Sequence, residues 1–141
     1  IILCSGKIYF ELQDHIETLH KENIHVFRVE QLYPFPYDTL GEELSKFSDC
    51  EIVWCQEEPK NMGSWSFVRS RIKVVLQKIQ SKQSKIPFIG RRSAASPATG
   101  VFDRHLANQQ NILRLAIEAD MKEIETEKEG VSLVKYKLPI E

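Results

Sequence analysis

The sequence predicts an α/β fold, a three-layer α/β/α sandwich built on a mostly parallel sheet. Four short, continuously apolar runs alternate along the chain with stretches whose apolar residues recur every three or four positions, which is the spacing of an amphipathic helix. Strands that are apolar on both faces are typical of parallel sheets covered by helices on each side. Right-handed crossovers then favour the strand order 2-1-3-4, which places helices on both faces.

The first half of the chain supplies two strands and two helices. Ile1–Cys4 is an apolar run that ends at Ser5-Gly6, and His25–Val29 is rich in β-forming residues, so both are predicted strands. The first helix is predicted by the stripe Ile8, Leu12, Ile16 and Leu19. The second begins near Pro36, a residue suited to a first helical turn, and is predicted by Tyr37, Leu40, Leu44 and Phe47.

Two further strand–helix pairs complete the predicted fold. Glu51–Cys55 and Ile86–Ile89 are the third and fourth predicted strands. Between them, Ser64 is the predicted N-cap of a helix whose stripe is Trp65, Val68, Ile72, Leu76 and Ile79. The last helix is predicted by Phe102, Leu106, Leu113 and Ile117.

Size and composition narrow the possible functions. The 141 residues suit a single domain, and a net charge of −1 gives no global field that favours nucleic acid or a membrane surface. No apolar stretch approaches the ~18 residues of a membrane-spanning helix, and no signal-peptide pattern opens the chain. Because the sequence begins at Ile1 within a strand and lacks an initiator Met, we expect a piece of a longer protein.

The cysteines and histidines suggest no metal site. Cys4 and Cys55 lie inside apolar runs and the three cysteines include no C-x-x-C pair, so the thiols are interpreted as small buried hydrophobes in a reducing compartment. His15, His20 and His25 are spaced by five residues, which rotates them by ~140° on a helix. We expect them at the surface or its boundary.

Charged residues gather where the predicted strands end. The carboxyl ends of parallel strands share one edge of the sheet, where ligands and partners bind. Glu57 and Glu58 follow the third strand, and Arg91 and Arg92 follow the fourth. We therefore expect the two carboxylates to face the arginines in a site or an interface, rather than to form a solvated surface.

The chain contains no complete catalytic motif. Ser5-Gly6-Lys7 lies between a strand and a helix, but it lacks the G-x-x-x-x-G-K-[ST] spacing of a phosphate loop and is interpreted as a tight turn. Neither G-x-G-x-x-G nor G-x-S-x-G occurs. Glu57 and Glu58 are residue types that serve as acid and base, but no nucleophile or metal cluster accompanies them. No catalytic residue is predicted here.

The loop from Arg91 to Gly100 contains the parts of an anion site. Two guanidiniums and three hydroxyls lie in a segment of small residues that leads into a predicted helix N-terminus. Alternatively, the arginines pair with Glu57 and Glu58 and hold the edge of the sheet together. Both interpretations stay open, and they can apply to different arginines.

Four stretches together resemble one family. They are "CSGKIYFEL", "RVEQLYPFP", "VWCQEEPKNMGSW" and "GRRSAASPATG", and over roughly residues 1–119 they resemble the C-terminal domain of the 2-oxoglutarate dehydrogenase E1 component. The succession of "EQLYPFP" and "WCQEEP" is specific to this branch, as opposed to pyruvate dehydrogenase or transketolase. The resemblance implies a transketolase C-terminal domain-like fold, in which an antiparallel edge strand precedes the position where this chain starts.

The resemblance also implies an activity for a longer protein. That enzyme uses thiamine diphosphate and magnesium to decarboxylate 2-oxoglutarate, and it succinylates the lipoyl group of E2 in the citric acid cycle, with E3 as a further partner. Its cofactor sites and catalytic histidines lie on preceding domains, so this fragment is expected to bind no cofactor and to be inactive alone. The domain is expected to contact the remaining E1 domains and to support the E1 homodimer, with Glu57 and Glu58 at an interface. The expected compartment is the cytoplasm of a bacterium or the mitochondrial matrix of a eukaryote.

Several family members carry an effector pocket for acetyl-CoA or AMP on this domain. Carried over by motif, that pocket would use Arg91, Ser93 and Ser96, and Lys60 would reach a phosphate. Arg92 is a weaker match, because the family commonly has Pro or another residue at this position.

Residues 120–141 depart from the family pattern, so the chain is divided into a domain, 1–119, and a tail. Asp120–Gly130 is charged and is interpreted as an exposed helix end or linker. Val131–Leu138 alternates like a half-buried strand and is followed by Pro139. It is expected either to dock on a sheet edge of this domain or of a partner copy, or else to pack elsewhere or stay disordered.

A second function class also fits the sequence. It is a free-standing regulatory module of flavodoxin-like topology that binds an anion or a nucleotide. Such a module should begin with Met and a complete first strand.

Overall fold

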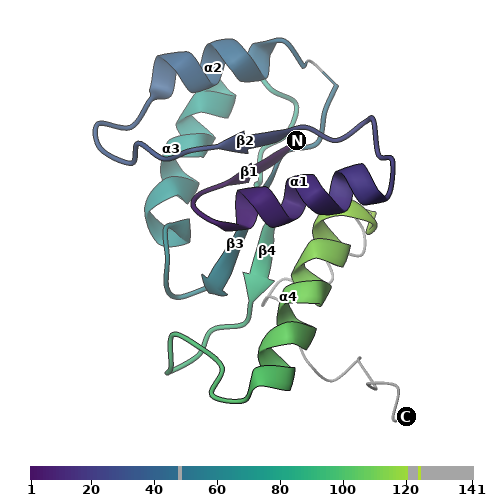
Figure 1. Cartoon of the computed structure of the whole chain (residues 1–141). Helices are drawn as coiled ribbons and strands as arrows, with labels where there is room; N and C mark the ends of the chain where they lie inside the picture. Colours follow the sequence, from purple (N-terminus) through teal and green to yellow (C-terminus); the bar gives the residue numbers. More distant parts are fainter. Residues whose placement is uncertain (48, 121–123, 125–141) are drawn as a thin grey trace.

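The computed structural model describes residues 1–47, 49–120 and 124. Strands and helices alternate strictly along the described chain (Figure 1). The strands are β1 (Ile2–Cys4), β2 (Val26–Arg28), β3 (Val53–Pro59) and β4 (Phe88–Arg91). The helices are α1 (Ile8–Thr18), α2 (Tyr37–Ser45), α3 (Trp65–Lys78) and α4 (Phe102–Ile117).

The four strands form one sheet in the order β2-β1-β3-β4, and each pairs in parallel with its neighbour. The predicted fold class and strand order are therefore confirmed. Ile2 lies opposite Val26 on one side and Val53 on the other, and Trp54 lies opposite Phe88. Beyond Cys55 the register between β3 and β4 shifts, so that Pro59 pairs with Arg91. This irregularity lies at the carboxyl edge, where the charged residues begin.

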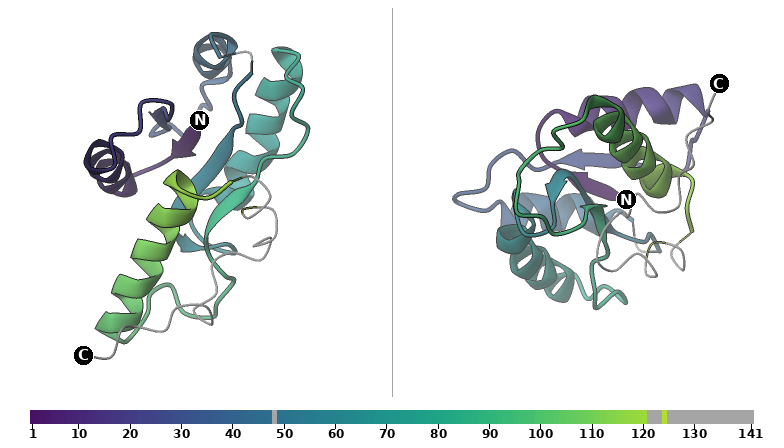
Figure 2. Two further views of the ribbon diagram at one scale, coloured as in Figure 1. Left: turned by 90° about the vertical axis from the view of Figure 1, so that its right-hand side faces the viewer. Right: turned by 90° about the horizontal axis from the view of Figure 1, so that it is seen from below.

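Two apolar cores lie on the two faces of the sheet. Helices α1 and α4 cover one face, and α2 and α3 cover the other (Figure 2). Successive side chains of a strand point to opposite faces. Accordingly, Cys4 and Cys55 pack under α1 and α4, whereas Leu3 and Trp54 pack under α2 and α3. Helices on both faces explain why β1 and the first half of β3 are apolar on both sides.

Helix α4 forms where predicted, but its buried face differs from the predicted stripe. Phe102 is 70 % exposed and Leu106 is 43 % exposed, so their assignment to a core-facing stripe was wrong. Ile117 of the predicted stripe is buried and Leu113 packs against the core, together with the buried Ala107, Asn108, Asn111, Ile112 and Leu115. The helix contacts β4 and β3 with this face, and the two polar asparagines at helical spacing obscured it in the sequence.

One residue beyond the predicted domain boundary belongs to the core. Ile124 is 6 % exposed and packs in the cluster beneath α1 and α4, and its amide donates to the carbonyl oxygen of Asp120 at 3.1 Å. The predicted strand Val131–Leu138 lies outside the described residues. In the described part, no helix combines the length and the apolar character needed to cross a membrane.

Candidate functional site at the carboxyl edge of the sheet

Side chains that follow different strands contact each other at the carboxyl edge. The backbone amide of Gly6, which follows β1, donates to Glu30 Oε1 at 2.8 Å. Glu30 follows β2 and also pairs with Arg28 at 3.3 Å. The Arg28 guanidinium in turn lies over the rings of Tyr9 and Phe10. Ser5-Gly6-Lys7 thus acts as a strand-to-helix turn whose Gly6 amide is already bonded, as expected of a turn rather than a phosphate loop.

A four-residue polar network joins α1, β3 and α4. Glu57 Oε1 lies 3.5 Å from Lys7 Nζ and accepts a hydrogen bond from Gln109 Nε2 at 3.2 Å. Lys7 also pairs with Glu11, and Gln109 Nε2 donates to Glu11 Oε2 at 2.6 Å. The hydrogen bond with Glu11 is the largest cause of the raised pKa of Lys7. The carboxylates of Glu11 and Glu57 are therefore bridged twice, once by the Lys7 ammonium and once by the Gln109 amide.

Glu57 and Glu58 lie at the end of β3, which runs to Pro59, so the predicted end of this strand at Cys55 was wrong. Gln56, in the same strand, organises the turn that follows them. Its side chain is 2 % exposed, and its amide nitrogen donates to the carbonyl oxygens of Glu58, Pro59 and Met62 at 3.3, 3.2 and 2.8 Å. Gly63 closes this turn at φ +64°, and a Cβ there would lie 3.0 Å from Gln56 Nε2. The side chain therefore bonds the backbone of the whole turn.

The oxygen of the same amide replaces the expected N-cap of α3. Ser64 occupies the N-cap position, but it has helical backbone angles and makes no side-chain cap hydrogen bond. Gln56 Oε1 instead accepts from the Trp65 backbone amide at 3.1 Å and from Trp54 Nε1 at 2.9 Å. This replacement could not be predicted from sequence, because the capping residue precedes the helix by nine positions.

Arg91 uses its guanidinium to hold the loop that follows β4. Its Nε donates to the Glu57 carbonyl oxygen at 2.9 Å, its Nη1 to Thr99 Oγ1 at 3.2 Å, and its Nη2 to the Pro97 carbonyl oxygen. Arg91 therefore reaches the backbone of Glu57, while the Glu57 carboxylate bonds Lys7 and Gln109 instead.

The other predicted effector residues lie around the same loop. The Lys60 backbone amide donates to the Arg91 carbonyl oxygen at 2.9 Å, and Lys60 Nζ lies 6.0 Å from the centre of the Phe88 ring. Ser93 and Ser96 are exposed. The loop is tied down by Asn61, whose side chain bonds both the amide and the carbonyl group of Ala94 at 3.1 and 3.0 Å.

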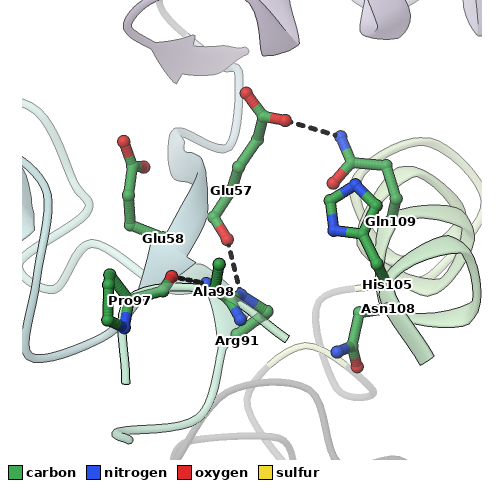
Figure 3. Close-up of a pocket in the computed structure, with 8 residues that line it drawn as sticks. All are labelled: Glu57, Glu58, Arg91, Pro97, Ala98, His105, Asn108 and Gln109. Atoms are coloured by element: carbon green, nitrogen blue, oxygen red, sulfur yellow. Dashed lines mark hydrogen bonds between the residues drawn. The ribbon is translucent and has the colours of Figure 1, made fainter. Parts of the chain in front are cut away.

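A pocket of about 230 Å³ lies between this loop and α4 (Figure 3). Its lining residues are Glu57, Glu58, Arg91, Pro97, Ala98, His105, Asn108 and Gln109. The structure thus brings three predicted residues, Glu57, Glu58 and Arg91, to one pocket. Lys60, Ser93 and Ser96 are not among the lining residues.

Sequence reasoning missed the contribution of α4 to this pocket. His105, Asn108 and Gln109 recur at spacings of three and four and share one face of the helix. That polar stripe was visible in the sequence. It had no assigned role because the fourth helix was placed by its apolar residues alone.

The donor sets in the described residues do not fit thiamine diphosphate and magnesium. Among residues 1–47, 49–120 and 124, no three or more His, Cys, Asp or Glu side chains are grouped so as to hold a metal ion. The guanidinium that lines the pocket already donates to two carbonyl groups and a hydroxyl.

The buried thiols are also poor candidates for chemistry. Cys4 and Cys55 are fully buried, and burial raises the pKa of Cys4 to about 12 and that of Cys55 well above its ordinary value. The thiolate is the reactive form, so both thiols are inert at neutral pH. This agrees with their interpretation as small core residues.

Fold and pocket together define a parallel α/β domain with a pocket at the carboxyl edge of its sheet. A model of the 2-oxoglutarate dehydrogenase C-terminal family matches residues 1–117, and the chain belongs to this family. The 2-oxoglutarate dehydrogenase E1 components of Brucella anthropi and Brucella ovis are each 47 % identical to it over 117 residues. That alignment covers 83 % of this chain and 12 % of each relative. The chain thus spans about an eighth of the length of these relatives.

Proposed function

We propose that this chain is the C-terminal domain of a working 2-oxoglutarate dehydrogenase E1 component. The observation that carries the proposal is 47 % identity over 117 residues to relatives that bear this name. In this proposal, the longer protein decarboxylates 2-oxoglutarate and succinylates the lipoyl group of E2 in the citric acid cycle, in a complex with E2 and E3. It works in the cytoplasm of a bacterium or in the mitochondrial matrix of a eukaryote.

Within that enzyme, the domain supports assembly and contributes no catalytic group. Thiamine diphosphate and magnesium are held by other domains, and this domain packs against them and supports the homodimer, with Glu57 and Glu58 at the interface. The network of Lys7, Glu11, Glu57 and Gln109 supports this role, because it holds the edge of the sheet in one arrangement.

Turnover tests the proposal. The longer protein, supplied with thiamine diphosphate, magnesium, 2-oxoglutarate and an artificial electron acceptor, should reduce the acceptor. The 141-residue chain under the same conditions should not. Activity of the short chain, or a longer protein that turns over other 2-oxoacids but not 2-oxoglutarate, would overturn the proposal.

A second part of the proposal is an effector site for acetyl-CoA or AMP at Lys60, Arg91, Ser93 and Ser96. The exposure of Ser93 and Ser96, which lie in the loop that Arg91 holds, supports it. Because the Arg91 donors hold the loop, we assign Arg91 to positioning the hydroxyls and supplying positive charge. A phosphate would be bonded by Lys60 and by the hydroxyls, and Ser96 Oγ, which donates to the Ala98 carbonyl oxygen at 3.1 Å, would exchange that partner for the phosphate.

Calorimetry of the longer protein with AMP and with acetyl-CoA tests this site. Removing a hydrogen bond to a charged group costs about 1.5–3 kcal/mol, so Ser93→Ala with Ser96→Ala should weaken binding at least ~10-fold. Ser84→Ala, an exposed serine in the loop before β4, is the matched control. Unchanged affinity in the double variant, or no binding by the unmodified protein, would remove the effector site from the proposal.

A further inference from the structure

The charge of this chain is segregated along its sequence. Residues 1–58 contain twelve Asp and Glu against four Lys and Arg. Between Glu58 and Asp103 there are nine Lys and Arg and no Asp or Glu. The net charge of −1 therefore conceals an acidic part and a basic part. Helix α3 belongs to the basic part, and it packs beside α2 on the face of the sheet opposite α1 and α4 (Figure 2).

The outward side of α3 consists of a neutral stripe between two basic rows. Four exposed residues at spacings of four, four and three form the stripe: Ser66, Ser70, Val74 and Gln77. Arg69 and Lys73 form the row on one side of it, and Arg71 and Lys78 form the row on the other. Because the stripe contains two serines and a valine, a second helix can approach closely between the rows.

The two basic rows differ in their partners. Lys78 pairs with a carboxylate of α2. Arg71 lies over the ring of Phe67 and donates to its carbonyl oxygen at 2.7 Å. Arg69 and Lys73 are exposed, and neither forms an ion pair within the part of the chain that the structure describes. This row therefore presents two positive charges that the domain itself does not neutralise.

We infer that the outward side of α3 is a docking surface for an acidic amphipathic helix of a separate protein. Small and apolar residues of that helix lie along the neutral stripe, and its carboxylates pair with Arg69 and Lys73. Charged positions beside such a seam determine the choice of partner in paired helices. The residues that line the pocket all lie outside α3, so this surface is separate from the pocket, and the inference does not depend on the proposed function.

Charge and length favour a helix as the occupant. Helix α3 has 14 residues and is thus about 21 Å long, and α2 beside it carries Asp38, which pairs with Lys78. A nucleic acid that extends beyond the basic rows would bring its phosphates against the carboxylates of α2. A second copy related by a two-fold axis would offer α2, where Lys78 and Lys46 already neutralise Asp38 and Glu43. A short acidic helix meets neither obstacle.

Fluorescence anisotropy with a labelled helical peptide tests the surface. The peptide matches α3 in length, with Ala and Leu along one stripe and Glu on both sides of it, and a second peptide has Lys in place of Glu. The longer protein should bind the Glu peptide, with an affinity that falls as salt is added, and should not bind the Lys peptide. Arg69→Glu with Lys73→Glu should weaken binding at least ~10-fold, because each reversal places like charges opposite each other. Absence of binding by the unmodified protein would overturn the inference.

Matched variants separate the shape of the surface from its net charge. Lys21→Glu with Arg104→Glu makes the same change in net charge at exposed positions away from α3 and should leave the affinity unchanged. Ser70→Trp fills the neutral stripe without changing the charge and should weaken binding several-fold, whereas Ser84→Trp, in the loop before β4, should not. Equal losses in the two charge variants, or full affinity in Ser70→Trp, would overturn the inference, because the attraction would then be diffuse.

Three further results would overturn the occupant. One is tighter binding of a DNA duplex of the same length than of the Glu peptide at physiological salt. The second is self-association in sedimentation that is lost in Arg69→Glu with Lys73→Glu, because a second copy would then occupy the surface. The third is peptide binding by the 141-residue chain but not by the longer protein, because other parts of the polypeptide would then cover α3. The variants should leave turnover of 2-oxoglutarate unchanged, so turnover tests the proposed function separately.

Discussion

Strand β3 changes its mode of stabilisation between Cys55 and Gln56. Trp54 and Cys55 are buried among apolar side chains from the neighbouring strands and from the helices that cover the sheet. Gln56 is equally buried, but its side chain makes five hydrogen bonds, four of them to backbone groups. At the centre of the sheet the stabilisation is spread over many contacts. At its carboxyl edge, single side chains determine the path of the backbone.

Truncation at the centre of the sheet should have the largest effect. Trp54→Ala removes a fully buried ring from the core beneath α2 and α3, and should lower the free energy of unfolding by about 3–5 kcal/mol. Trp54→Phe is the matched control. It keeps most of the ring and loses the hydrogen bond to Gln56, at a cost of about 1–2 kcal/mol. Urea denaturation monitored by circular dichroism measures the free energy of unfolding of both variants. Equal losses in the two variants would mean that packing does not dominate here.

Gln56→Ala should have the next largest effect. It leaves the Trp54 indole N–H and the Trp65 amide without their acceptor and frees three carbonyl groups of the turn. Two buried donors without a partner cost about 2–4 kcal/mol. Gln77→Ala, at an exposed position on α3, should have little effect. Hydrogen exchange adds a second measurement, because the Trp65 amide should lose protection in Gln56→Ala. Unchanged protection would contradict the capping role.

Arg91→Lys should act mainly on the loop rather than on the whole domain. Lysine keeps the charge but cannot reproduce the planar set of donors that bonds Glu57, Pro97 and Thr99. We expect a loss of about 1–2 kcal/mol and faster hydrogen exchange over residues 92–100. Arg92→Lys, at an exposed position, is the control. If the amides of residues 92–100 exchange at the same rate in both variants, the loop does not depend on the Arg91 contacts.

The smallest effect is expected for a surface pair that joins α2 to α3. The hydrogen bond and charge of Lys78 hold the pKa of Asp38 below its ordinary value, and Asp38 raises the pKa of Lys78. Asp38 therefore stabilises the fold above its unfolded-state pKa, and this contribution is lost as the pH falls through the lowered folded-state pKa. The contribution of Lys78 is present below its unfolded-state pKa and is lost as the pH rises through the raised one.

Asp38→Asn tests this pair. Its free energy of unfolding should be slightly below that of the unmodified chain at neutral pH, because exposed pairs contribute little. The difference should vanish in acid, once Asp38 is protonated. A difference that persists unchanged in acid would mean that the side chain acts through something other than its charge.

The apolar pattern was enough to predict the sheet, because burial under helices on both faces requires strands that are apolar throughout. The runs at Ile1–Cys4 and Glu51–Cys55 were placed at its centre because the order 2-1-3-4 puts helices on both faces. The same reasoning failed for α4, where Phe102 and Leu106 had the spacing of a core stripe but face outward. Apolar spacing marks a shared face of a helix, and only packing decides which face is buried.

The sequence by itself determined the fold class, the strand order and the gathering of Glu57, Glu58 and Arg91 at one edge, because these follow from periodicity and from the geometry of parallel sheets. Only the tertiary structure decided what those side chains bond. Arg91 reaches the backbone of Glu57, 34 positions away, and the Glu57 carboxylate reaches Gln109, 52 positions away. A charged residue in the sequence indicates that its side chain needs a hydrogen-bond or ion-pair partner. Which group becomes that partner depends on the distance and direction between the two groups, and these are set only when the chain folds.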